Sequence, residues 1–131
     1  WSCHLIEHEM SAQWDIPHGA GLAVITPVWM RYVYEEDIQI FAKLGVTVFG
    51  LEYDFDNPRA TAEETIFRFE QFFQSLGMPT RISQFGTGEV TEEILWEMAG
   101  RIPYYKENNT RIGTVKSLSA EDIVEIYRRA L

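Results

Sequence analysis

Apolar residues along this chain recur mostly at helical spacing, and short polar or proline-containing breaks separate the apolar stretches. The first break, Asp15-Ile16-Pro17, predicts a turn, because the residue before a proline avoids the helical region. We therefore expect one helix from about Ser2 to Gln13 and a second from about His18 to Val33. The second helix is apolar on all sides, which indicates that it is buried.

Two further helices are expected in the middle of the chain. The acidic run 35–37 suits the positive end of a third helix, and Gly45 is its predicted stop. Residues 46–49 are typical of a strand, so a short extended segment is an alternative there. Thr61 and Glu64 predict the start of a fourth helix, because they fit a capping box in which each side chain binds a backbone N–H of the first turn.

The remaining pattern is also helical. One helix is expected from about Thr91 to Gly100, and another starts at Ser119 with Asp122 at the capping-box position. Six helices and no convincing sheet predict an all-α fold. The apolar face expected for the fourth helix consists of Ile66, Phe69, Phe73 and Leu76.

Composition narrows the class of protein. The 131 residues are 46% hydrophobic, which is enough for a core, and the formal net charge of -9 argues against nucleic acid or an anionic membrane as a partner. The single cysteine, Cys3, excludes an internal disulfide. The longest apolar run, 20–30, is shorter than the ~20 residues of a membrane span. We expect a cytoplasmic protein, and we interpret Trp1, which already lies in a helical pattern, as a cut through a longer chain.

All three histidines lie near the N-terminus. His4 and His8 are four residues apart, so they project from one face of the first helix. The turn at Pro17 can fold His18 back towards His4. Neutral imidazole is a good ligand for zinc or ferrous iron, so the cluster is a candidate metal site. The alternative is that one or two of these histidines are ordinary polar residues near the surface.

The segment His4-Leu5-Ile6-Glu7-His8 also matches H-x-x-E-H, the pattern of the inverted zinc peptidases. In that pattern the two histidines bind zinc and Glu7 acts as the base. The pattern is short, and it requires a distant acidic ligand. The candidates for that ligand are Glu89, Glu92 and Glu93.

A longer match covers residues 4–21. It contains a histidine, a second histidine four residues on, the small pair Ser11-Ala12 and a Pro-His-Gly turn. This segment resembles the second signature of the iron-containing (type III) alcohol dehydrogenases. The resemblance extends over the whole chain and favours the butanol-dehydrogenase branch, through the segments 29–32, 72–79 and 119–127. The chain would correspond to the C-terminal part of such an enzyme.

The resemblance implies a role for each histidine. His4 and His18 match the two metal ligands of the family's helical domain, whereas His8 matches a histidine near the nicotinamide and the substrate, with a part in proton relay. The metal would be Fe²⁺ or Zn²⁺, acting as a Lewis acid on the oxygen of a small alcohol or aldehyde, with NAD(P)H as the hydride carrier. The parent enzyme is expected to be a homodimer. Glu7 is dispensable for a dehydrogenase and essential for a peptidase.

Residues 1–131 would then form a single partial domain, a C-terminal helical metal-binding domain truncated at its N-terminus. The chain lacks the aspartate and further histidine of the family site, and also the N-terminal nucleotide-binding domain that binds most of the NAD(P)H. Gly19-Ala20-Gly21 is not a remnant of that domain, because Val24 replaces the third glycine of its motif. These glycines are expected to permit close packing. The isolated chain is expected to be inactive.

A third hypothesis is a helical interaction module without catalysis, in which the histidines are incidental. Histidine rings that point apart would favour this hypothesis.

Overall fold

The computed structural model describes residues 1–102 and 111–131, and this part of the chain is all-α. Its only strand-like pairing is one isolated antiparallel bridge between Ile112 and Leu118. None of its helices is long and apolar enough to cross a membrane. The α-helices are α1 (Ser2–Trp14), α2 (His18–Val33), α3 (Ile38–Phe49), α4 (Pro58–Ser75), α5 (Glu92–Arg101) and α6 (Ala120–Ala130). Two short 3₁₀ helices are η1 (Tyr34–Glu36) and η2 (Ile82–Phe85).

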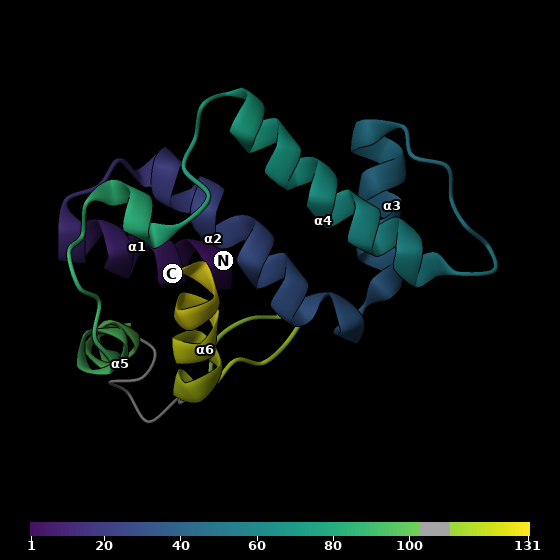
Figure 1. Ribbon diagram of the computed structural model, residues 1–131. Coiled ribbons are helices and arrows are strands. Elements are labelled where there is room, and N and C mark those ends of the chain that lie inside the picture. Colours follow the sequence, from purple (N-terminus) through teal and green to yellow (C-terminus); the bar gives the residue numbers. More distant parts are fainter. Residues whose placement is uncertain (103–110) are drawn as a thin grey trace.

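The α2 helix lies at the centre of the arrangement. It packs against α1, α4 and α6, while α5 packs against α1 and α6 (Figure 1). α3 lies at the opposite end of the molecule from α5 and packs mainly on α4 (Figure 1). The prediction that the second helix is buried is confirmed, since its buried positions lie on several sides. Fully buried core side chains from five helices include Ile6, Met10, Ile25, Ile66, Leu95, Met98, Ile123 and Tyr127.

The end of α3 differs from the prediction. The helix passes through Gly45 and continues to Phe49, so the predicted stop and the alternative strand at 46–49 are both wrong. Gly50 ends the helix instead, in a left-handed conformation (φ 66°) that suits glycine. Gly45 permits α3 and α4 to pack closely, because a Cβ at this position would lie only 1.9 Å from Oγ1 of Thr65 in α4.

The start of α4 also differs. The helix begins at Pro58, one turn before the predicted capping box of Thr61 and Glu64, which is therefore wrong. Proline suits the first helical position, because the N–H that it lacks would have no partner within the helix. The Thr61 hydroxyl instead accepts a hydrogen bond from the backbone N–H of Asp54 (3.0 Å). Leu76, expected on the apolar face, is 56% exposed.

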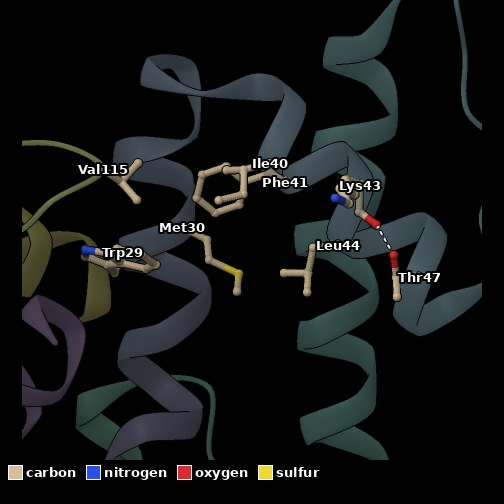
Figure 2. A pocket seen from close by; sticks show the side chains of 8 residues that line it. All are labelled: Trp29, Met30, Ile40, Phe41, Lys43, Leu44, Thr47 and Val115. Atoms are coloured by element: carbon tan, nitrogen blue, oxygen red, sulfur yellow. Dashed lines mark hydrogen bonds between the residues drawn. The ribbon is translucent and has the colours of Figure 1, made fainter.

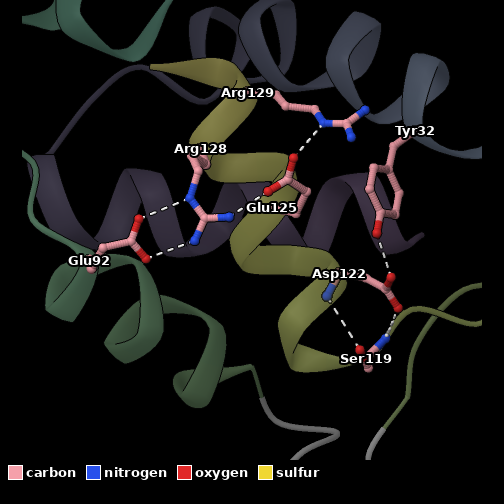
Figure 3. A network of polar contacts seen from close by, with 7 residues as sticks. All are labelled: Tyr32, Glu92, Ser119, Asp122, Glu125, Arg128 and Arg129. Carbon is pink, nitrogen blue, oxygen red and sulfur yellow. Dashed lines mark hydrogen bonds and ion pairs between the residues drawn. The ribbon is translucent and has the colours of Figure 1, made fainter.

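Both later helices begin where the sequence predicts. The Thr91 side chain accepts from the N–H of Ile94 at the start of α5. At the start of α6, Ser119 Oγ accepts from the N–H of Asp122 (3.3 Å), and Asp122 Oδ2 accepts from the N–H of Ser119 (2.7 Å) (Figure 3). Tyr32 of α2 donates its hydroxyl to the other oxygen of Asp122 (2.5 Å), so the cap joins α6 to α2.

An open apolar groove lies between α2 and α3. Lys43 is the one ionisable side chain in its lining (Figure 2). The groove therefore offers apolar contact but no group of ionisable side chains that could carry chemistry. Its lining residues are Trp29, Met30, Ile40, Phe41, Lys43, Leu44, Thr47 and Val115.

Candidate metal centre

The first two helices form a hairpin (residues 2–33), which we call the histidine hairpin. α1 ends because Asp15 adopts a left-handed conformation (φ 50°), while its N–H donates to the Ser11 carbonyl (2.9 Å). Pro17 then takes an extended conformation (φ -61°, ψ 126°), so that α2 begins at His18. This reversal brings the first residue of α2 next to α1.

The hairpin gathers the three histidine rings. The ring centroid of His4 lies 4.4 Å from that of His8 and 4.5 Å from that of His18. The centroids of His8 and His18 are 5.1 Å apart. One potential ligand atom from each residue lies within 4.8 Å of the other two. Within residues 1–102 and 111–131, no other such group of three potential metal ligands occurs. The predicted convergence across the proline turn is confirmed, and the splayed rings expected of an incidental cluster are not found.

A buried carboxylate supports the cluster from within the hairpin. The side chain of Glu7 is fully buried, and its Oε2 contacts Nδ1 of His18. Its other oxygen, Oε1, accepts a hydrogen bond from the Ser11 hydroxyl (2.5 Å). Gly21 provides the space, since a Cβ there would lie 2.2 Å from Glu7 Oε1. The carboxylate is therefore enclosed by both helices.

The surroundings of His4 favour its neutral form. Desolvation lowers the pKa of His4 below its usual value of 6.5, and the neighbouring His8 and His18 lower it further. The edge of the Trp1 ring lies against His4, with ring centroids 5.6 Å apart. The neutral imidazole is the form that binds metal ions, so this environment suits a ligand.

Other candidate ligands lie outside the cluster. Cys3 faces Thr26, with Sγ 3.4 Å from Oγ1, and burial raises the pKa of its thiol to about 11. A thiol that resists ionisation is a poor metal ligand. Glu92 forms a two-point ion pair with Arg128 of α6 (2.9 and 2.8 Å) (Figure 3). None of the acids considered for a peptidase site joins the three histidines in the described part of the chain.

The position of Glu7 bears on the peptidase hypothesis. A general base in such an enzyme must reach a metal-bound water at an open site. Glu7 is fully buried and engaged by His18 and Ser11, so its carboxylate is not presented to such a water. The peptidase hypothesis is not supported.

Sequence reasoning located the three histidines but missed the residues that support them. The motifs give Glu7 a role only in a peptidase and treat it as dispensable in a dehydrogenase, and they include Ser11 only as part of a small pair. The spacing of Glu7 and Ser11 by four residues was a usable signal, because it places both side chains on one face of α1. The expected close packing is confirmed at Gly21, whereas Gly19 has open space around it.

The fold and this cluster together indicate the class of protein. The chain is a helical domain with a candidate metal centre formed by imidazole side chains. The model of the Fe-containing alcohol dehydrogenase family, C-terminal, matches residues 1–131. The chain therefore belongs to the iron-containing alcohol dehydrogenase family and corresponds to its C-terminal part.

Individual relatives agree with this assignment. The chain is 37% identical over 131 residues to NADH-dependent butanol dehydrogenase A of Clostridium acetobutylicum, covering 99% of this chain and 32% of that protein. It is 34% identical to probable NADH-dependent butanol dehydrogenase 1 of Bacillus subtilis, covering 100% of this chain and 32% of that protein. The crystal structure of NADH-dependent butanol dehydrogenase A from Thermotoga maritima matches with a TM-score of 0.82 and 31% identity, over 99% of this chain and 32% of that one. The chain thus spans about a third of the length of these relatives.

Proposed function

We propose that this chain is the C-terminal metal-binding part of an NAD(P)-linked, metal-dependent alcohol dehydrogenase or aldehyde reductase. The observation that carries the proposal is the convergence of one potential ligand atom each from His4, His8 and His18. Membership of the iron-containing family and the names of the relatives support the same activity. The reaction would transfer a hydride from NAD(P)H to a small aldehyde, whose oxygen takes up a proton to give the alcohol.

The donor set fits a divalent transition metal. His4 and His18 would hold Fe²⁺ or Zn²⁺, both of which accept imidazole nitrogen. His18 uses Nδ1 to contact Glu7, which leaves its Nε2 as the nitrogen available to an ion. When bound, the ion supplies Lewis-acid polarisation of the alcohol or aldehyde oxygen.

His8 is the candidate proton-transfer residue. It is exposed, unlike Glu7 on the same helix, and its ring lies beside those of both proposed ligands. An imidazole in this position can exchange protons with water and deliver one to the substrate oxygen. In this proposal His8 transfers protons, whereas His4 and His18 bind the metal.

Two ligands form only part of a stable site, since metal sites in proteins generally use about four. We propose that residues 1–131 are a partial domain, and that the rest of the enzyme supplies an aspartate, a further histidine and the nucleotide-binding domain. This chain would then line one side of the substrate pocket in a homodimeric cytoplasmic enzyme. The isolated chain would bind metal weakly and have no dehydrogenase activity. Butyraldehyde reduction by the purified chain alone would contradict this arrangement.

The test uses the full-length enzyme that contains this chain. His4→Ala and His18→Ala are expected to lower bound metal and to reduce NADH-linked butyraldehyde reduction by at least about 100-fold, since even supporting residues around a metal cost 10–100-fold. His8→Ala is expected to keep the metal while lowering kcat. Glu92→Gln is the control, because it removes a carboxylate that pairs with Arg128 away from the histidines. Retention of full metal content by either His4→Ala or His18→Ala would overturn the proposal.

A further inference from the structure

Glu7 is an unusual residue within the core. Its side chain has no exposed surface, and in the described part of the chain its recorded ion-pair partner is His18 rather than a lysine or arginine. Burying a carboxylate costs free energy unless hydrogen bonds and charge partners compensate for the lost water. A neutral residue would join the two helices at a lower cost, so the presence of a carboxylate requires a further explanation.

The carboxylate is held in one orientation from two sides. Ser11, one turn further along α1, donates its hydroxyl to Oε1, and the same hydroxyl lies 3.2 Å from the carbonyl oxygen of Ile16 in the turn. Gly21 of α2 leaves a space that any larger residue would fill, because a Cβ there would overlap the carboxylate. These contacts point Oε2 at Nδ1 of His18.

This contact selects one form of the His18 ring. A carboxylate accepts hydrogen bonds, so Nδ1 must carry the proton that it donates to Glu7. In the neutral ring Nε2 then carries the lone pair. Histidines that bind metals commonly donate their other N–H to a carboxylate, which fixes the ring orientation and makes the ligand nitrogen more basic.

We propose that Glu7 is a positioning residue that holds His18 with Nε2 ready to bind the metal ion, assisted by Ser11 and by the space at Gly21. This inference rests on the proposed function, because it assumes that His18 is a ligand. It assigns to Glu7 a role that is neither that of a peptidase base nor that of a dispensable helix residue.

The experiment measures Zn²⁺ affinity of the metal-free full-length enzyme by competition with a chelating dye. Glu7→Gln is expected to weaken Zn²⁺ binding by about 10–100-fold, the usual effect of losing a residue that orients a ligand. Ser11→Ala, which removes one neutral hydrogen bond, is expected to weaken it by about fivefold. Glu9→Gln is the matched control, because Glu9 lies on the same helix and pairs with Arg101 (2.7 Å) instead of a histidine.

Two further measurements separate positioning from a purely structural role. The thermal midpoint of metal-free Glu7→Gln should stay close to that of the wild type, since glutamine has nearly the same size and its side-chain oxygen can still accept the hydrogen bond from Ser11. A structural role predicts a lower midpoint. With Co²⁺ as the probe, the visible spectrum of Glu7→Gln should keep the wild-type ligand pattern at saturation, because the histidines remain, whereas His18→Ala should change it.

The outcomes distinguish this inference from the proposed function. If His18→Ala binds Zn²⁺ as tightly as the wild type, the proposed function fails, and the inference fails with it. If His18→Ala loses affinity while Glu7→Gln and Ser11→Ala do not, only the positioning role is overturned. Should Glu7→Gln not fold, Ser11→Ala decides, and an unchanged Zn²⁺ affinity in that variant overturns the inference.

Discussion

The histidine hairpin and the α3–α4 pair share one packing feature but differ in the contacts that this feature permits. In each, a glycine allows two helices to approach around a buried polar side chain: Gly21 beside Glu7, and Gly45 beside Thr65. The buried Thr65 hydroxyl donates to the Thr61 carbonyl of its own helix (2.8 Å), so its hydrogen bond remains local. Glu7 instead contacts a histidine of the other helix. A buried polar group therefore indicates function when it is ionisable and bonded to a potential ligand.

The outer surfaces of the two regions also differ. The hairpin presents imidazole rings at its surface, whereas the α3–α4 pair presents apolar side chains. Phe49 and Phe69 join the two helices edge to face, with centroids 4.9 Å apart. Ile40, an exposed apolar residue of α3, also lines the apolar groove between α2 and α3 (Figure 2). Large exposed apolar side chains of this region include Ile40, Val48, Phe67, Phe72 and Leu76.

The largest effect on stability is expected from Gly45→Ala. The added Cβ would lie 1.9 Å from Thr65 Oγ1 and 2.8 Å from Leu51 Cδ1, so the helices must separate. A contact this short places the overpacking cost at the upper end of the usual range of about 1–3 kcal/mol, and this cost exceeds the gain of about 1 kcal/mol in helix propensity from replacing glycine. Urea unfolding should show the loss, while Zn²⁺ affinity stays unchanged.

A double variant tests the cause of that loss. Thr65→Ala removes the hydroxyl that the new Cβ would meet, so the effects of Gly45→Ala and Thr65→Ala should not add. Strict additivity of the two unfolding free energies would show that the close contact between Gly45 and Thr65 does not matter.

Gly21→Ala, in contrast to Gly45→Ala, should affect the metal site as well as the packing of its two helices. Its Cβ would displace the Glu7 carboxylate, so Zn²⁺ affinity should fall by about 10–100-fold, as for loss of the carboxylate itself. Gly19→Ala is the matched control, because it lies in the same helix with no atom near the new Cβ. Equal Zn²⁺ affinity in the Gly21→Ala and Gly19→Ala proteins would contradict the distinction between the two glycines.

A third variant separates stability from ligand orientation. Tyr127 of α6 is fully buried and donates its hydroxyl to the Ile6 carbonyl of α1 (2.7 Å). Tyr127→Phe removes this hydrogen bond and should lower stability by about 0.5–1.5 kcal/mol. Zn²⁺ affinity should not change, since Glu7 and His18 keep their contact. A parallel loss of affinity would mean that any destabilisation of α1 weakens the site.

Local patterns predicted the parts of the fold and site that depend on neighbours along the chain. The cap of α6 by Ser119 was correct because both partners lie within one turn. The convergence of His4 and His18 was predictable because a helical repeat and a proline turn fix it. The burial of Glu7 against His18 was not predictable, since a carboxylate on α1 has the same local pattern whether it is buried or exposed.

The errors in the α3–α4 pair have a related cause. Gly45 and Thr61 carry true local signals for a helix end and a helix start, yet neither performs that role. Gly45 is required by the approach of α4, and Thr61 binds the loop that precedes its helix. Contacts between segments distant in the sequence override local preference at both positions.

The smallest effect is expected at the end of α2 opposite His18, and it appears only at alkaline pH. Burial, together with the hydrogen bond to Asp122, raises the pKa of Tyr32 from 10.0 to about 12. The unfolded chain ionises this phenol near its ordinary pKa, so its contribution to stability is complete below pH 10 and is lost as the pH rises towards 12.

The wild type should therefore lose stability more steeply than Tyr32→Phe over this pH window, as measured by urea midpoints. Tyr53→Phe is the control, because the Tyr53 hydroxyl donates to the neutral amide of Gln39 (2.5 Å) instead of a carboxylate. Its midpoints should follow the wild-type slope. Parallel slopes for the wild type and Tyr32→Phe would show that the bond between α2 and the α6 cap contributes nothing.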